Sequence, residues 1–134
     1  MKIFLDSSAI IEFFRNTPKA VDAVNNADEI YTSSICAYEV LLGEIYREEK
    51  YGKSHLEKMQ RFFETAATLP FTHSDSSRAA GMIVKLSLKG KKVPDFDAMI
   101  ATQALSNGAT VLTKDPKHFN AIKEETGLSV EVVS

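Results

Sequence analysis

The sequence has one cysteine among its 134 residues, no long hydrophobic run and no excess of basic charge. A single thiol, Cys36, excludes an internal disulfide and a zinc site built from several cysteines. Its apolar neighbours predict a buried, reduced side chain. No stretch approaches the roughly 18 apolar residues of a membrane span, and the apolar run at residues 3–5 is too short for a signal peptide. We therefore expect a cytoplasmic protein without membrane contact.

Length and net charge set further limits. A chain of 134 residues is large enough for one domain with its own core, so we expect a single domain over residues 1–134. The formal net charge of −2 is no global signature of a nucleic-acid partner. A basic groove can still be local, so a nucleic-acid partner is not excluded.

Short apolar runs alternate with helical patterns, which is typical of a parallel sheet covered by helices on both faces. The expected fold class is α/β: a three-layer α/β/α sandwich around a mostly parallel sheet of about five strands. Pro70 indicates an edge position for its strand, because proline cannot donate to the ladder. The five predicted strands are Ile3–Leu5, Glu29–Thr32, Thr68–Thr72, Thr110–Thr113 and Leu128–Val133.

Helices are expected between these strands, with small polar residues at their starts. Ser7 or Ser8 would cap the first helix. Ser33 or Ser34 would cap a long one that Gly52 divides in two. The remaining helices are expected around Val21–Val24, from Ser74 or Asp75 to Leu88, over Asp95–Ser106 and over Phe119–Thr126.

Four acidic residues each follow a predicted strand or lie in the first turns of a predicted helix. Ligands of open parallel sheets bind beyond the carboxyl ends of the strands, so these side chains can meet at one edge. Four carboxylates there would repel by ~4 kcal/mol per pair at about 4 Å and an effective dielectric constant of about 20. Such a cluster requires bound cations, and hard oxygen ligands suit Mg²⁺ or Mn²⁺. The four residues are Asp6, Glu39, Asp97 and Asp115.

Each acid also has a simpler explanation. Asp6 is a good helix N-cap, although Ser7 or Ser8 would serve and leave its carboxylate free. Glu39 would lie on a solvated helix face, yet its apolar neighbours favour a buried carboxylate with a partner. Asp115 precedes a proline and would favour a turn. Their joint placement on four elements favours a common site over four independent caps.

Asp95 and Asp97 open a helix, where acidic side chains complement the helix dipole by ~0.3–1 kcal/mol. We expect Asp95 to cap the helix or support the site. Asp97 runs into the apolar stretch 98–101 and is the better inward candidate. Ser7 and Thr113 are expected to hydrogen-bond the carboxylates around the metal.

Four short motifs occur in order along nearly the whole chain. The first two are Phe-Leu-Asp-Ser-Ser at residues 4–8 and Tyr-Glu-Val-Leu-Leu-Gly at 38–43. The others are Asp-Phe-Asp-Ala-Met-Ile-Ala at 95–101 and Thr-Lys-Asp-Pro-Lys-His-Phe at 113–119. Each is weak alone, but with all four the chain resembles the PIN-domain family of metal-dependent ribonucleases, specifically its small VapC-like toxins. The resemblance implies a PIN-like fold and the toxin of a type II toxin–antitoxin pair.

The resemblance implies Asp6, Glu39 and Asp97 as metal-binding acids, with Asp115 as the fourth. It implies Mg²⁺, or Mn²⁺, as the cofactor and one or two ions that orient and deprotonate a water for in-line attack on an RNA phosphodiester. The products implied are a 3′-hydroxyl and a 5′-phosphate. The family often carries asparagine where Ser8 stands, and Ser8 keeps a hydrogen-bonding side chain.

No histidine is needed as a base in this mechanism. The three histidines show no ligand spacing and are expected at the surface or in caps; they are His55, His73 and His118.

Basic residues near the predicted site are candidates for RNA-phosphate contacts. The lysines before Pro94 would equally suit a solvated helix C-terminus, where cations complement the dipole. The candidates are Arg15, Lys91, Lys92 and Lys114.

The resemblance further implies a small antitoxin that covers the site, and a homodimer. We expect the helical stretch from Glu39 to Ala66 to make these contacts, unless its apolar side chains pack in the core. The aromatic candidates in this stretch are Tyr46, Tyr51, Phe62 and Phe63.

Other phosphate-handling α/β proteins fit the residues less well. A haloacid-dehalogenase-like phosphatase would carry a second acid at the position of Ser8, and a receiver domain would carry an acidic pair that residues 2–5 do not supply. Two alternatives to the toxin stay open: an RNA-processing PIN nuclease without an antitoxin, and a non-catalytic PIN-like binding module. The small size favours the toxin by analogy.

Overall fold

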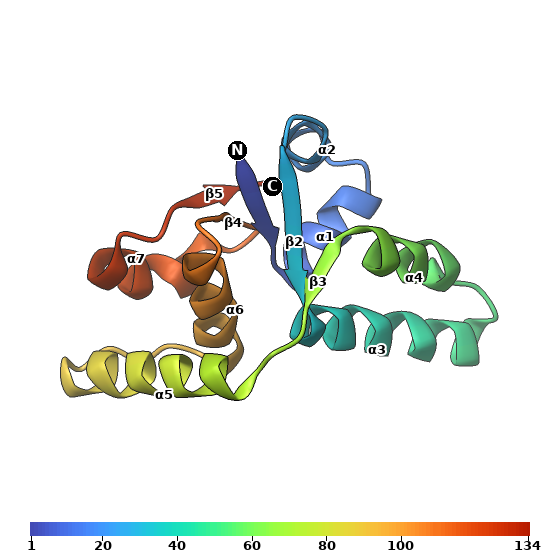
Figure 1. Cartoon of the computed structure of the whole chain (residues 1–134). Coiled ribbons are helices and arrows are strands. Elements are labelled where there is room, and N and C mark those ends of the chain that lie inside the picture. Colours follow the sequence, from blue (N-terminus) through green and yellow to red (C-terminus); the bar gives the residue numbers. More distant parts are fainter.

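The computed structural model describes residues 1–134 and contains a five-stranded sheet between two layers of helices (Figure 1). The order of the strands across the sheet is β3-β2-β1-β4-β5, and all neighbouring pairs are parallel. This confirms the predicted three-layer α/β/α fold. The strands are β1 (Lys2–Leu5), β2 (Glu29–Ser33), β3 (Ala67–Leu69), β4 (Thr110–Thr113) and β5 (Val130–Val132).

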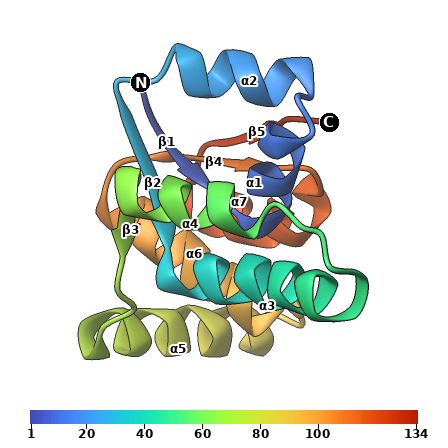
Figure 2. The same cartoon turned by 90° about the vertical axis from the view of Figure 1, so that its right-hand side faces the viewer.

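The helices divide between the two sides of the sheet. Figure 2 faces the side formed by the first four, which are α1 (Ser7–Phe14), α2 (Pro18–Asn25), α3 (Ser34–Tyr51) and α4 (Leu56–Thr65). The opposite side holds α5 (His73–Leu88), α6 (Asp95–Ser106), the 3-10 helix η1 (Pro116–Phe119) and α7 (Asn120–Thr126). None of these helices has both the length and the apolar character needed to cross a membrane.

The core is built on the two central strands. Phe4, Leu5, Val111 and Leu112 are fully buried because helices cover both faces of β1 and β4, which is why these strands are continuous apolar runs in the sequence. Burying each such side chain stabilises the fold by ~1.5–3 kcal/mol. Cys36 is free and buried as predicted, and its burial raises the pKa of its thiol to about 12.

Two element boundaries confirm the sequence prediction, and the start of α1 corrects it. The Ser33 side chain caps α3, and α3 ends at Gly52 in the left-handed conformation with φ 70°. However, the Asp6 carboxylate caps α1, instead of Ser7 or Ser8.

The third strand is shorter than predicted, although its edge position is confirmed. It ends at Leu69, and Thr72, expected at its end, caps α5 instead of Ser74 or Asp75. Thr72 and Asp75 form a reciprocal capping box, which satisfies two backbone N–H groups at the helix start.

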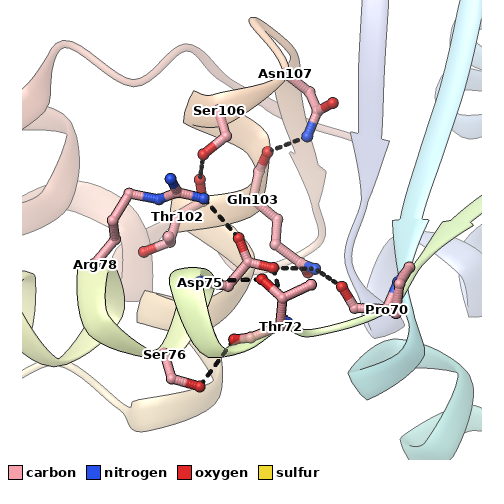
Figure 3. A network of polar contacts seen from close by, with 9 residues as sticks. All are labelled: Pro70, Thr72, Asp75, Ser76, Arg78, Thr102, Gln103, Ser106 and Asn107. Atoms are coloured by element: carbon pink, nitrogen blue, oxygen red, sulfur yellow. Dashed lines mark hydrogen bonds and ion pairs between the residues drawn. The ribbon is translucent and has the colours of Figure 1, made fainter.

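Asp75 joins α5, α6 and the end of β3 in one polar network (Figure 3). Its carboxylate accepts hydrogen bonds from the Thr72 N–H at 3.0 Å, from Arg78 Nη2 at 2.7 Å and from Gln103 Nε2 at 3.4 Å. Gln103 Nε2 also donates to the Pro70 carbonyl at 3.2 Å. Burial alone would raise the pKa of Asp75, but these contacts hold that pKa below its usual range.

Asp75→Ala should lower the free energy of unfolding by about 2 kcal/mol, because it removes half of the capping box, the hydrogen bond from Gln103 and a half-exposed ion pair with Arg78. Urea unfolding followed by circular dichroism measures the change. Ser77→Ala, an exposed position in the same turn, is the matched control. Equal stability of the two variants would show that the network does not hold α5 against α6.

Candidate active site

The sheet places a topological switch point between its two central strands. From β1 the chain proceeds to β2 and β3 on one side, and it then returns to β4 and β5 on the other. Open parallel sheets bind ligands beyond the carboxyl ends of the strands at such a point. Asp6 directly follows β1, and Asp115 lies two residues after the end of β4.

A cleft of about 190 Å³ lies at this point. It gathers side chains from Asp6 and α1, from α3, from α6, from the end of β4 and from the segment that follows β4. The four predicted acids line it, and so do the two residues predicted to support them, Ser7 and Thr113. Its lining consists of Asp6, Ser7, Ser8, Glu39, Asp97, Ile100, Thr113, Asp115 and His118.

Asp6 both caps α1 and lines the cleft, so capping and a place in the site are not alternatives. Its Oδ1 accepts hydrogen bonds from the Ala9 N–H at 2.8 Å and from Ser8 Oγ at 2.7 Å. Burial raises the pKa of Asp6, although hydrogen bonds from Thr113 and Ser8 act in the opposite direction. The largest contribution to the free-energy cost of ionising Asp6 is therefore its removal from water.

Two neighbouring serines fix the relative positions of the elements around the cleft. Ser7 Oγ donates to Glu39 Oε1 at 2.7 Å and so connects α1 with α3. Ser8 Oγ accepts from the Lys114 N–H at 2.9 Å and connects the start of α1 with the residue that follows β4. Thr113 Oγ1 accepts from the Asp115 N–H at 3.1 Å. The carboxylates are thus held by short polar side chains rather than by the backbone alone.

Asp97 and His118 form a contact that sequence spacing did not predict. His118 Nδ1 lies 3.0 Å from Asp97 Oδ2, and its Nε2 lies 3.5 Å from Asp115 Oδ2. Despite this approach, Asp97 Oδ2 is buried and accepts no hydrogen bond. Burial raises the pKa of Asp97. His118 lowers this pKa, whereas the charges of Asp6, Glu39 and Asp115 raise it further.

His118 is half exposed, so its predicted surface position is confirmed, but it also lines the cleft, which the sequence did not predict. It is three residues after Asp115, and η1 brings side chains at that spacing to the same side of the chain. The signal available in the sequence was this Asp-to-His spacing after a strand.

Asp95 does not take the predicted supporting or capping role. It is exposed in the first turn of α6, it lies outside the cleft, and Pro94 occupies the N-cap position without any side-chain cap. The carboxylate of Asp97 is the one that lines the cleft.

Two of the four basic residues that were predicted to contact RNA phosphates form ion pairs with carboxylates of the protein. Lys91 Nζ lies 2.6 Å from Glu124 Oε2, and Lys114 Nζ lies 3.0 Å from Glu12 Oε1. Arg15 and Lys92 are exposed and have no ion pair.

The four carboxylates line the same cleft, but they do not converge closely around one position for a metal ion. No three His, Cys, Asp or Glu side chains of the structure are close enough together to form a ready metal-binding group. The unpartnered Asp97 oxygen is nevertheless a buried acceptor with unused capacity.

The fold and the cleft together define a class of protein: a parallel α/β/α domain with an acidic cleft at the switch point of its sheet. A family model described as the PIN domain matches residues 3–125. The chain belongs to the PIN domain family.

Comparisons with individual proteins agree with this family. Ribonuclease VapC19 of Mycobacterium tuberculosis is 27% identical over 120 residues, which cover 86% of this chain and 90% of that protein. The fold is similar to VapBC2 of Rickettsia felis bound to a promoter DNA fragment, with a TM-score of 0.80, 20% identity and full coverage of both chains. It is also similar to a toxin–antitoxin complex of Klebsiella pneumoniae, with a TM-score of 0.73, 19% identity and 98% and 96% coverage.

Proposed function

We propose that this chain is a metal-dependent endoribonuclease that hydrolyses RNA phosphodiester bonds and is the toxin of a toxin–antitoxin pair. The observation that carries the proposal is the placement of Asp6, Glu39, Asp97 and Asp115 around one cleft of a PIN domain. The similarity to a protein named ribonuclease VapC19 supports RNA as the substrate. Because the proposed substrate is RNA, we also place the proposed activity in the cytoplasm.

The residues of the cleft fit a hard divalent cation. Their donors are carboxylate oxygens, which suit Mg²⁺ or Mn²⁺, and Asp97 Oδ2 is a buried acceptor without a hydrogen-bond partner. Asp6, Glu39, Asp97 and Asp115 would hold the metal. When bound, Mg²⁺ supplies positive charge against the phosphate and lowers the pKa of water.

The protein's own contribution is to fix the carboxylates before RNA arrives. Ser7 holds Glu39 and Ser8 holds Asp6, each through a hydrogen bond of 2.7 Å. Such supporting contacts keep acidic side chains in a single orientation despite their mutual repulsion. His118 lies between Asp97 and Asp115, and its proximity lowers the pKa of Asp97.

The ends of the cleaved RNA test this chemistry. Hydrolysis by activated water leaves a 3′-hydroxyl and a 5′-phosphate. Acid–base catalysis by His118 would instead use the RNA 2′-hydroxyl and leave a 2′,3′-cyclic phosphate. We expect a 5′-phosphate on RNA cleaved with Mg²⁺, measured by ligation of the downstream fragments. Cyclic phosphate ends formed in EDTA would contradict the proposal.

An exposed apolar stripe on α3 supports a protein partner beside the site. Tyr38, Leu42, Ile45 and Tyr46 follow helical spacing on one face, and all are between 45% and 61% exposed. Glu39 of the cleft belongs to the same helix. We propose that the antitoxin covers this stripe, in keeping with the similarity to a toxin–antitoxin complex. A homodimer through the same α3–α4 region is also part of the proposal.

The aromatic candidates of the α3–α4 region divide into two groups. Tyr46 and Tyr51 are exposed. Phe62 and Phe63 instead pack against the core, where Phe62 meets Phe13 and Phe14 with ring centroids 6.0 and 5.7 Å apart. These two phenylalanines therefore follow the alternative of core packing, and a contact of either with a partner stays a prediction.

A further inference from the structure

A second cleft adjoins the active-site cleft. It has a volume of about 240 Å³, lies between α1, α3 and the start of α4, and shares Glu39 with the active-site cleft. Glu39 thus stands where the two hollows meet. The polar residues and the glycine that line this second cleft are Arg15, Glu39, Gly43, Glu44, Arg47 and His55.

Arg15 is the unpaired cation of the second cleft. The chain has four arginines, and the other three each lie within 4.0 Å of a carboxylate. The Arg15 side chain is exposed at the end of α1, and no ion pair involves it. Its guanidinium can therefore bind an incoming anion without first breaking an internal contact.

The carboxylate of Glu44 does not cancel this charge. Glu44 is buried, its Oε2 accepts the His55 N–H at 2.8 Å, and its Oε1 lies 3.8 Å from Arg47 Nη1. Glu44 therefore serves the turn before α4, where it satisfies a backbone donor. Arg47, with its long contact to Glu44, adds a second positive charge to the rim of the cleft.

Gly43 keeps the cleft open. It is exposed one turn after Glu39 on α3, and a Cβ atom added at this position would meet no atom within 4 Å. Because Gly43 lines the second cleft and has room for a Cβ atom, we expect a larger side chain here to occupy part of the cleft. This position therefore offers a way to fill the cleft while leaving its charged residues unchanged.

We propose that the second cleft binds the RNA phosphate next to the scissile one, with Arg15 as the principal contact and Arg47 in support. A strand whose scissile phosphate lies at the active-site cleft must continue past its wall, and at Glu39 that wall is shared with the cleft that Arg15 lines. The carboxylates repel the neighbouring phosphates, so the adjacent one needs a cation nearby. Arginine suits this role because its planar fork binds phosphate through two hydrogen bonds.

The other basic residues fit this position less well. Lys91 and Lys114 are paired with Glu124 and Glu12. Lys92 is free of ion pairs, but it does not line either cleft. The inference rests on the proposed function, since it names a subsite for the RNA substrate of the same active site.

The test measures binding of a fluorescein-labelled, single-stranded RNA that the wild-type protein cleaves. The variants are made in an Asp97→Asn background so that the RNA stays intact, and fluorescence anisotropy gives Kd across a series of salt concentrations. Adding Arg15→Gln should weaken binding about tenfold, as expected for loss of a charge-assisted contact. It should also reduce the slope of log Kd against log salt by ~0.7, the value for one phosphate contact to a single strand.

Three further variants make the result specific. Arg15→Lys should retain the salt slope, because its positive charge remains. Gly43→Leu should weaken binding by filling the cleft. Arg61→Gln is the matched control, because Arg61 is exposed on α4, pairs with Glu57 and lies outside both clefts. It should change Kd by less than about twofold.

The outcomes separate this subsite from the proposed function. If the wild-type protein cleaves RNA but Arg15→Gln matches Arg61→Gln in both Kd and salt slope, the subsite is wrong and the nuclease assignment stands. If the wild-type protein cleaves no RNA, the proposed function fails and the subsite fails with it.

Discussion

Asp97→Asn should abolish Mg²⁺-dependent cleavage of single-stranded RNA, with a fall in rate of about a thousandfold or more. The substitution keeps the size of the side chain but removes a negative charge from the cleft. Metal ions contribute several kcal/mol of charge stabilisation to hydrolysis of this kind, and each ~1.4 kcal/mol is a factor of ten. Single-turnover cleavage of a labelled RNA measures the loss. Asp6→Asn should behave in the same way.

Asp95→Asn is the matched control for this prediction. It makes the same chemical change in the same helical turn, but Asp95 is exposed and lies outside the cleft. Its rate should stay within about twofold of wild type. Full activity of Asp97→Asn, with a folded protein shown by circular dichroism, would contradict the assignment of this carboxylate to the site.

The second large effect concerns stability. Millimolar Mg²⁺ or Mn²⁺ should raise the melting temperature of the wild-type protein by about 3–6 °C once the metal exceeds its dissociation constant about tenfold. The cation binds the native state and relieves repulsion between the carboxylates. Differential scanning fluorimetry with and without EDTA measures the shift. Asp97→Asn should respond little, because one of the proposed ligands has lost its charge.

In the metal-free protein, the charge of Asp97 should have the opposite effect on stability and lower the melting temperature. Burial raises the pKa values of Asp6 and Asp97 above their usual value of 3.8, so their stabilising contribution is complete below that value and is lost as pH rises through the raised pKa. At pH 7 in EDTA, Asp97→Asn should therefore melt above wild type, and the difference should shrink towards pH 4. A variant that melts below wild type at pH 7 would show that Asp97 is satisfied without a metal.

Part of the fold was predictable because it depends on local patterns. The continuous apolar runs around Phe4 and Val111 mark buried parallel strands, and their ends locate the edge where the acids gather. The order of the strands was not predictable in this way, since it depends on which pairs form in three dimensions. Two predicted helix starts were wrong for a related reason: Thr72 caps α5 because it forms a reciprocal box with Asp75, and the Asp6 carboxylate caps α1 in place of the serines after it.

The residues of the cleft likewise divide into those that could be predicted from the sequence and those that could not. Asp6, Glu39, Asp97 and Asp115 could be brought together from their positions on predicted elements, and all four line one cleft. Their catalytic roles remain predictions. His118 was missed because its partner Asp97 is 21 residues away on another element. The pairing of Lys91 with Glu124 was equally hidden, since the loop after α5 meets α7 only in the folded chain.

The most direct measurement of the central claim is a time course of RNA cleavage by the purified wild-type protein under three conditions. These are Mg²⁺, excess EDTA, and EDTA followed by Mg²⁺ in excess of the chelator. A metal-dependent nuclease should cleave with Mg²⁺, stop with EDTA and recover when Mg²⁺ is restored. Cleavage that continues unchanged in EDTA, or no cleavage of any RNA under all three conditions, would contradict the account.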